Sequence, residues 1–169
     1  YKLNGLGMRI AKVQGTATLT RFVNDPSGQL AEEIVPGSNT TSYYLRLRGQ
    51  LVGIVRNSSL YFVHGDQLGR PEIVTNASKA TVWKANNYAF DRTVTIDNIG
   101  GLSLGFPGQY YDTETGIWWN GFRSYDAKRG RYLQSDPIGL NAGINTYSYV
   151  EANPIRSVDL LGLTWEYDL

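Results

Sequence analysis

Two aspartates open similar five-residue motifs near the end of the sequence. Asp136 begins Asp-Pro-Ile-Gly-Leu, and Asp159 begins Asp-Leu-Leu-Gly-Leu. Two carboxylates that lie close together cannot both ionise easily, so one of them keeps a proton. One can then act as a base on water while the other acts as an acid on the attacked amide. The residues alone favour a simpler interpretation, in which each aspartate opens a turn, because Asp-Pro is a common turn starter.

Other side chains with chemical potential are few. His64 is the single histidine and cysteine is absent, so the sequence predicts no metal site, no disulfide and no thiolate nucleophile. The stretch Gly5-Leu6-Gly7 lacks the third glycine and the helix of a phosphate-binding loop, and no cofactor is expected. Tryptophans can form a sugar-binding platform, although packing in the interior is the favoured interpretation. They are Trp83, Trp118, Trp119 and Trp165.

The composition indicates a folded β protein. Aromatic residues make up 12% of the 169 residues, charged residues make up 18%, and 19 residues are glycine. This mixture excludes long-range disorder and disfavours a helical bundle. The net charge of +1 gives no electrostatic case for binding nucleic acid or an anionic membrane. No apolar run is long enough to predict a membrane span, and the residues after Tyr1 show no signal peptide.

The elements that must position the candidate residues are predicted from a degenerate repeat. In each instance an aromatic residue is followed by an aspartate and, a few positions later, by a glycine. Aspartate can hydrogen-bond the backbone of its own turn and glycine supplies a positive φ, so each instance predicts strand, turn and strand. The instances join Asp25 with Gly28, Asp66 with Gly69, Asp112 with Gly116, and Asp126 with Gly130.

Helical periodicity is nearly absent. Residues 145–151, which precede Asn153-Pro154, are the best candidate for one short helix. We therefore predict an all-β fold of antiparallel hairpins with less than about a fifth of the residues in helices. Such hairpins cannot bury their faces alone and should stack on neighbouring repeats. Because the chain does not begin with methionine, we expect a fragment of a longer chain.

Several motifs in a common order resemble the Rhs-associated core of bacterial Rhs and YD-repeat proteins, which are related to the C component of Tc toxins. The resemblance spans residues 61–163. Before residue 61, only the regular spacing of the repeat matches. The motifs are His64-Gly65-Asp66-Gln67-Leu68-Gly69-Arg70, Gln109-Tyr110-Tyr111-Asp112, Arg123-Ser124-Tyr125-Asp126, Ser135-Asp136-Pro137-Ile138-Gly139-Leu140 and Asp159-Leu160-Leu161-Gly162-Leu163.

The resemblance implies an architecture and a role. It implies the end segment of a spiral β-cocoon, a hollow shell of YD repeats that encloses a C-terminal toxin. Residues 1–60 are then degenerate YD-type repeats, residues 61–163 the shell-closing core, and residues 164–169 a tail after a cleavage site. The implied partners are the remaining shell repeats and the caged toxin. The implied localisation is that of a bacterial effector, secreted or delivered to the cell surface, for example by type VI secretion.

Many family members cut their own chain, and the resemblance implies how. It implies aspartic-protease chemistry by Asp136 and Asp159, with the cut between Leu163 and Thr164. The family usually has proline after the second aspartate, whereas this sequence has Leu160. Because proline fixes φ and leucine leaves it free, we expect weakened or abolished cleavage. We also expect an intact bond in this fragment, either because Leu160 replaces proline or because the enclosing shell is missing. Whether the chain is an enzyme is therefore open at this point.

An arginine beside the first aspartate is a further feature of Tc relatives. Here that neighbour is Ser135, and the nearest upstream arginine is Arg131, which is a candidate auxiliary residue although packing in a turn is the favoured role. If the dyad exists, the carboxylates of Asp136 and Asp159 should lie within about 8 Å, a distance that one bridging water spans.

A non-enzymatic function is the alternative. YD repeats have been linked to carbohydrate binding, which suggests a surface or adhesion module in which Trp118 is a candidate sugar contact. In either case the isolated end of a shell exposes a strand edge. We therefore predict that the strands within residues 1–35 lie on an open edge or pair with another chain, which would allow self-association.

Overall fold

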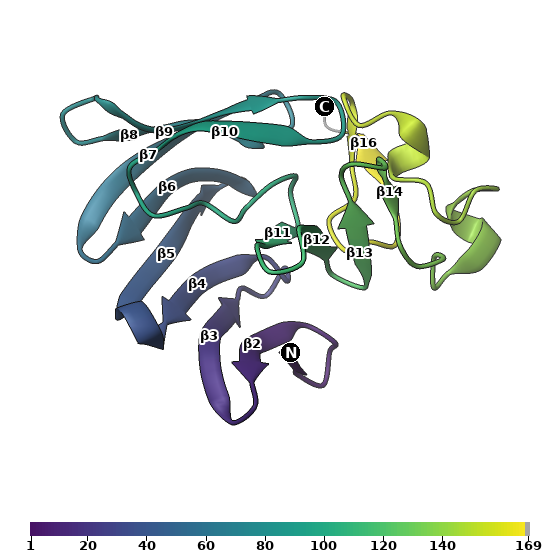
Figure 1. The fold of residues 1–169 in the computed structure, drawn as a ribbon. Coiled ribbons are helices and arrows are strands. Elements are labelled where there is room, and N and C mark those ends of the chain that lie inside the picture. Colours follow the sequence, from purple (N-terminus) through teal and green to yellow (C-terminus); the bar gives the residue numbers. More distant parts are fainter. Residues whose placement is uncertain (168–169) are drawn as a thin grey trace. The chain divides into compact units, whose positions relative to one another are not determined.

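The computed structural model describes residues 1–167, and it consists of antiparallel β-sheets, as the sequence predicts. Ten strands follow each other in one sheet in the order of the sequence, four form a second sheet, and two more form a pair (Figure 1). The large sheet contains β1 (Lys2–Leu3), β2 (Arg9–Gln14), β3 (Ala17–Asn24), β4 (Leu30–Val35), β5 (Thr40–Leu47), β6 (Gln50–Arg56), β7 (Ser59–Gly65), β8 (Pro71–Asn76), β9 (Thr81–Asn87) and β10 (Arg92–Asp97). The small sheets contain β11 (Gln109–Asp112), β12 (Ile117–Asn120), β13 (Arg123–Asp126), β14 (Arg131–Tyr132), β15 (Ser157–Val158) and β16 (Glu166–Tyr167).

The chain divides into two compact units. The first unit comprises Tyr1–Val63 and the hairpin tip Thr75–Ala80, and the second comprises His64–Val74 and Thr81–Leu169. Both candidate aspartates belong to the second unit.

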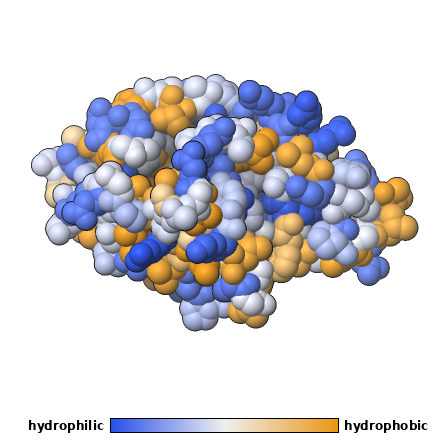
Figure 2. Space-filling model, turned by 60° about the horizontal axis from the view of Figure 1, so that its bottom comes forward, coloured by the Kyte–Doolittle hydropathy of each residue, from blue (hydrophilic) through white to orange (hydrophobic). Residues whose placement is uncertain are grey.

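Strands of the first unit alternate between a buried and an exposed face. Tyr44 and Ile54, which are paired across β5 and β6, are buried, whereas Tyr43 and Leu45 are 48% and 43% exposed. The Tyr44 hydroxyl donates a 2.6 Å hydrogen bond to the carboxylate of Glu33, which satisfies a polar group on the buried face. Exposed apolar side chains therefore recur on the surface of the protein (Figure 2).

The predicted Asp-Gly turns are confirmed. Asp66 Oδ1 accepts hydrogen bonds from the backbone N–H groups two and four residues further on, both at 3.0 Å, and Gly69 has a φ of 76°. Asp25 and Gly28 form the same turn. Asn76 also opens such a turn, although the repeat was defined by aspartate. Asparagine works here because its side-chain carbonyl accepts the same two bonds.

Aromatic side chains form the core of the second unit. Trp118, Tyr125 and Tyr132 are cross-strand neighbours on β12, β13 and β14, and all three are buried. Tyr149 packs on Tyr125 with ring centroids 4.8 Å apart, and Phe106 packs on Tyr149 at 5.1 Å. Edge-on and tilted contacts of this kind stabilise a core beyond the area that they bury.

The expected short helix over residues 145–151 is wrong. The described residues contain no α-helix, only the short 3-10 turns η1 (Pro36–Ser38), η2 (Gly139–Ala142) and η3 (Val150–Ala152). In η3, Val150, Glu151 and Ala152 have φ of 43°, 52° and 61°, a left-handed conformation that costs an L-residue about 1–2 kcal/mol. Tyr149 and Val150 are buried in the aromatic core, and this burial offsets the strain. Across the described residues, no helix is long and apolar enough to span a membrane.

The N-terminal strand forms an edge of the large sheet. β1 is only two residues long, is exposed, and pairs with β2 through Lys2–Ala11 and Leu3–Arg9. Of the strands within residues 1–35, only β1 is therefore an edge strand, whereas β2, β3 and β4 are each paired on both sides. Self-association through this edge stays a prediction.

Candidate active site

Strand β13 supplies the central charged residue of the site. Asn120 on β12 lies opposite Arg123, and Gln109 on β11 lies opposite Asn120, so three buried polar side chains form a row across the sheet. Tyr125 follows Arg123 by two residues and therefore points to the same face of the strand. The polar row thus borders the aromatic core.

Arg123 brings the two aspartates together. Its Nη2 atom lies 2.7 Å from Asp136 Oδ2 and 3.1 Å from Asp159 Oδ2, and each of these side chains is at most 3% exposed. Because both oxygens lie this close to one nitrogen, they are closer to each other than the limit of about 8 Å for a water-bridged dyad. The predicted proximity of the carboxylates is confirmed, and their catalytic role stays a prediction.

Asp136 is positioned by a returning segment of the chain. Its N–H donates a 2.9 Å hydrogen bond to the carbonyl of Thr146, and Arg123 Nη1 donates to the same carbonyl at 3.1 Å. Asp136 Oδ1 accepts the N–H of Ile138 at 3.0 Å, and Gly139 has a φ of 65°. Asp136 therefore opens a turn, as Asp-Pro predicts, and also reaches Arg123, so the two interpretations of this residue are compatible.

Asp159 is held by four hydrogen-bond donors. Its Oδ1 accepts the backbone N–H groups of Gly162 at 2.7 Å and Leu163 at 3.0 Å. Its Oδ2 accepts the Tyr132 hydroxyl at 2.8 Å and Arg123 Nη2 at 3.1 Å. The carboxylate thereby fastens the loop that follows it and places Leu163 beside the aspartate pair.

Asp136 is bound less completely than Asp159. The aligned N–H of Arg123 Nη2 points to Asp159 Oδ2, whereas its 2.7 Å contact with Asp136 Oδ2 is an ion pair without hydrogen-bond alignment. Within residues 1–167, buried Asp136 Oδ2 accepts no hydrogen bond. An oxygen with free lone pairs in a buried site can accept a water or a proton.

The bond between Leu163 and Thr164 lies in a hairpin loop. β15 pairs with β16 so that Val158 faces Glu166, and the loop joins these two residues. Leu163 is half-buried and Thr164 is exposed. Trp165 packs against the aromatic core. The chain is therefore anchored on both sides of the expected cleavage site.

Glycines allow the loop to approach β11 and β12 closely. A Cβ atom on Gly108 would lie 2.1 Å from the carbonyl oxygen of Leu160, and one on Gly121 would lie 2.3 Å from that of Leu161. Both glycines also have positive φ, of 86° and 56°. No larger residue fits at either position without displacing the loop backbone.

The environment of the site keeps nearby phenols protonated. Burial, followed by the negative charge of Asp159, raises the pKa of Tyr132 well above its ordinary value. Burial, followed by the charges of Tyr125 and Asp159, does the same to the pKa of Tyr149. Tyr132 is therefore a neutral hydroxyl that can donate to Asp159 at neutral pH.

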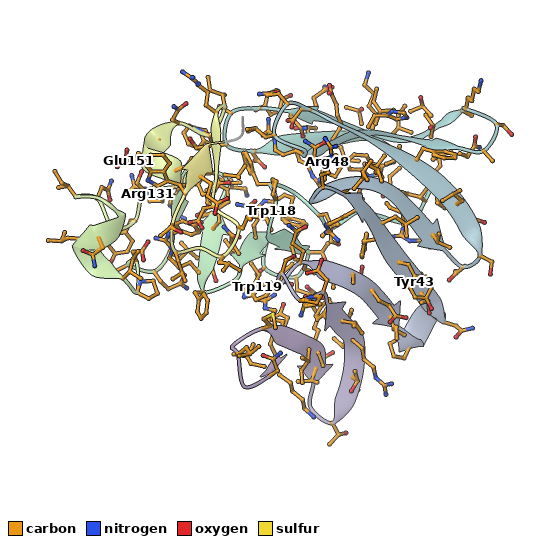
Figure 3. The ribbon with its side chains drawn as sticks, turned by 180° about the vertical axis from the view of Figure 1, so that it is seen from behind. Tyr43, Arg48, Trp118, Trp119, Arg131 and Glu151 are labelled. Carbon is orange, nitrogen blue, oxygen red and sulfur yellow. The ribbon has the colours of Figure 1, made fainter. Side chains whose placement is uncertain are left out.

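Arg131, the candidate auxiliary arginine, is not the residue that joins the aspartates. It is exposed, lies opposite Asp126 in the strand pairing, and is found away from Trp118 (Figure 3). Arg123 supplies the guanidinium instead. The sequence contains a signal for it, because strand alternation places Arg123 on the same face as the aromatic Tyr125.

Leu160 stands where the family usually has proline. None of the four hydrogen bonds to Asp159 uses the N–H of Leu160, so they do not distinguish leucine from proline at this position. The expected effect of Leu160 on cleavage, and the expected intact bond, stay predictions.

The other candidate residues do not converge on a site. His64 is exposed on β7. Trp83 and Trp118 are 0% and 5% exposed and both contact the guanidinium of Arg92, at 5.1 and 4.8 Å from the ring centroid. These indoles pack in the interior, as the sequence favours, and are not available to an exposed sugar-binding platform.

Known proteins are similar to this chain in sequence. The family model described as the teneurin YD-shell matches residues 9–155. Double-stranded DNA deaminase toxin A of Burkholderia cenocepacia is 39% identical over 120 residues, covering 68% of this chain and 8% of that protein. Toxin protein Tse5 of Pseudomonas aeruginosa is 27% identical over 198 residues, covering 96% of this chain and 15% of Tse5. This chain therefore spans only a small part of these relatives.

Solved structures of Tc toxins have the same fold. The Tc holotoxin pore of Photorhabdus luminescens, with a mutant TccC3, matches 96% of this chain and 9% of that one, with a TM-score of 0.71 and 18% identity. The crystal structure of TcdB2-TccC3-TEV matches the same shares with a TM-score of 0.69 and 19% identity. The repeated Asp-Gly hairpins, the family match over most of the sequence and the shared fold agree. The chain belongs to the teneurin YD-shell family and is a YD-repeat shell segment related to those of Rhs and Tc toxins.

Proposed function

We propose that this chain is the shell-closing segment of a YD-repeat toxin and that the bond between Leu163 and Thr164 is cut by this segment in the full-length protein. One observation carries the proposal. Asp136 and Asp159 share the guanidinium of Arg123, and Asp159 binds the N–H of Leu163, one bond before the expected cut.

The proposed reaction is hydrolysis of one peptide bond. Paired carboxyl groups beside an amide suit acid and base catalysis. An ionised carboxylate can activate water, and a protonated carboxyl group can protonate the leaving nitrogen. The water attacks the carbonyl carbon of Leu163, and Thr164 leaves as an amine. Each molecule reacts once, since its own chain is the substrate.

The proposed partners follow from the size of the relatives. This chain covers 8% of the deaminase toxin and 15% of Tse5, so the proteins that share its sequence are much longer. We place the remaining shell repeats and an enclosed C-terminal toxin around this segment. The whole protein is then a bacterial effector that is secreted or delivered to the cell surface.

Asp136→Asn in the full-length protein tests the proposal. We expect this variant to lose the fragment that begins at Thr164, as measured by intact mass and N-terminal sequencing. Asp126→Asn is the matched control, because Asp126 is a buried aspartate of the same unit that accepts the N–H of Lys128 and lies in another turn. We expect the control to be processed normally. Normal processing of Asp136→Asn would refute self-cleavage by this pair.

A further inference from the structure

We infer that the two aspartates have different roles: Asp136 carries the proton in the cut, and Asp159 is a positioning residue that holds the loop before the cleaved bond. This inference rests on the self-cleavage proposed above and divides the work within that site. Two interchangeable carboxylates would be expected to have similar surroundings, and these two do not.

Asp159 has no free acceptor position. An ionised carboxylate has about four lone-pair sites. The four sites of Asp159 face the N–H groups of Gly162 and Leu163, the hydroxyl of Tyr132 and Nη2 of Arg123, at 2.7 to 3.1 Å. A water or a proton could bind only by displacing one of these donors, and each displacement would loosen the loop.

Further contacts hold Asp159 and its loop in one position. Asn120 Nδ2 donates to the main-chain carbonyl of Asp159 at 2.9 Å and to the hydroxyl of Tyr132 at 2.7 Å. Arg123 Nε donates to the carbonyl of Gly162 at 2.6 Å. The side chain and the backbone around Asp159 are therefore fixed from β12, β13 and β14, as a positioning role requires.

Asp136, in contrast to Asp159, has free acceptor positions on its carboxylate. Its Oδ1 accepts one backbone N–H, from Ile138, and its Oδ2 accepts no hydrogen bond within residues 1–167. That oxygen is buried and lies 2.7 Å from Arg123 Nη2, the nitrogen that also contacts Asp159. It is the carboxylate oxygen of the pair with capacity to bind the attacking water.

The proposed step balances with one water. The Asp136 carboxylate takes a proton from water as the water oxygen bonds to the carbonyl carbon of Leu163. The bond from that carbon to the nitrogen of Thr164 then breaks, and the proton moves from Asp136 to this nitrogen. The products are a carboxylic acid at Leu163 and an amine at Thr164, and Asp136 ends in its starting form.

The rate of processing in variants of the full-length protein tests this division. We expect Asp136→Asn to slow the appearance of the Thr164 fragment by about 10²- to 10⁴-fold, the usual contribution of acid and base catalysis. Asp159→Asn keeps one oxygen for the N–H groups of Gly162 and Leu163. We expect it to slow the cut by only about tenfold, which is less than the about 10²-fold that a misplacement of about 1 Å can cost.

The pH dependence separates the two roles further. The charged and titratable groups that face the pair include Arg123, which contacts both carboxylates, and Tyr132 and Tyr149, whose pKa values are raised in part by the charge of Asp159. The acid limb of the rate profile should persist in Asp159→Asn, because Asp136 remains. Equal losses in both variants, or loss of the acid limb in Asp159→Asn alone, would overturn the division while leaving self-cleavage intact. A wild-type rate in Asp136→Asn would instead refute the cleavage mechanism itself.

Tyr132→Phe provides a test that does not alter either carboxylate. It removes one donor to Asp159, so we expect a slowing of about tenfold or less with an unchanged acid limb. Tyr125→Phe is its matched control, since Tyr125 is a buried neighbour whose hydroxyl donates to the carbonyl of Phe90. The control should be processed normally. A loss for Tyr132→Phe as large as that for Asp136→Asn would contradict a positioning role, even if Asp159→Asn fails to fold.

Discussion

The guanidinium of Arg123 contacts both aspartates and two backbone carbonyl groups. Its Nε donates to the carbonyl of Gly162, its Nη1 donates to the carbonyl of Thr146, and its Nη2 contacts both aspartates. The planar guanidinium offers five N–H donors in a rigid fork, which an ammonium group cannot reproduce. One buried side chain therefore joins two separate segments to β13.

Arg123→Lys should destabilise the protein even though the charge is kept. A single ammonium cannot reach all of these acceptors, and each buried group left without a donor costs about 1–3 kcal/mol. We expect the free energy of unfolding in urea to fall by about 2–4 kcal/mol. Arg131→Lys, at an exposed position on the next strand, should change it by less than about 0.5 kcal/mol. Equal effects of the two substitutions would argue against the shared role of Arg123.

Among the strands and turns, the hairpin between β15 and β16 contains the proposed cleavage site. Its loop packs closely on the turns before β11 and β13. As a result there is no room for a Cβ atom at Gly108 or at Gly121. The two Asp-x-x-Gly-Leu motifs differ in this respect. Gly139 of the first motif has open space around it, whereas Gly162 of the second would place a Cβ 2.4 Å from the carbonyl oxygen of Asn120.

A pair of glycine substitutions separates close approach from backbone strain. Gly121 and Gly139 have similar φ, of 56° and 65°, so alanine meets similar conformational strain at both. Only at Gly121 would the new Cβ collide with backbone, the carbonyl of Leu161 at 2.3 Å. We expect Gly121→Ala to lower the free energy of unfolding by about 1–3 kcal/mol more than Gly139→Ala, measured in urea. Equal losses would mean that the loop can move aside freely.

At the scale of the whole molecule, the second unit depends on buried tyrosines. Tyr125, Tyr132 and Tyr149 pack against one another, with ring centroids 4.8 to 5.9 Å apart. Burial is the main cause that raises the pKa of each of the three phenols. These residues therefore pack as neutral side chains, and ionising any one of them would place a charge in the core.

Alkaline pH should therefore unfold the second unit. A phenol whose pKa is raised by folding contributes stability that is complete below the ordinary pKa of about 10 and is lost as pH rises toward the folded-state pKa. We expect unfolding above about pH 10, with three of the 12 tyrosines forming tyrosinate only as circular dichroism reports loss of structure. Near neutral pH the ionisation of these three phenols should not change the free energy of unfolding. Titration of all tyrosines at an ordinary pKa, with the fold intact, would contradict this.

Local chemistry was enough to predict the turns, the strands and the inward aromatic residues. Aspartate followed by glycine predicts the turns at Asp25 and Asp66, because the side chain accepts backbone N–H groups and glycine takes the positive φ. Strand alternation and aromatic residues predict an all-β fold with tyrosine and tryptophan inside. The paired motifs at Asp136 and Asp159, read with the family resemblance, also predict that two carboxylates meet.

The way in which those carboxylates are bound depends on long-range packing and could not be predicted from the sequence. Arg123 is 13 residues before Asp136 and 36 before Asp159 in the sequence, and no local pattern joins them. Their contact depends on the pairing of β12, β13 and β14 and on the return of the chain through Thr146. The left-handed turn at Val150 likewise contradicts its local preference, because burial of that segment in the aromatic core outweighs the backbone strain. Long-range packing does not follow a fixed spacing in the sequence. It is this packing that gives the two aspartates different hydrogen-bond partners.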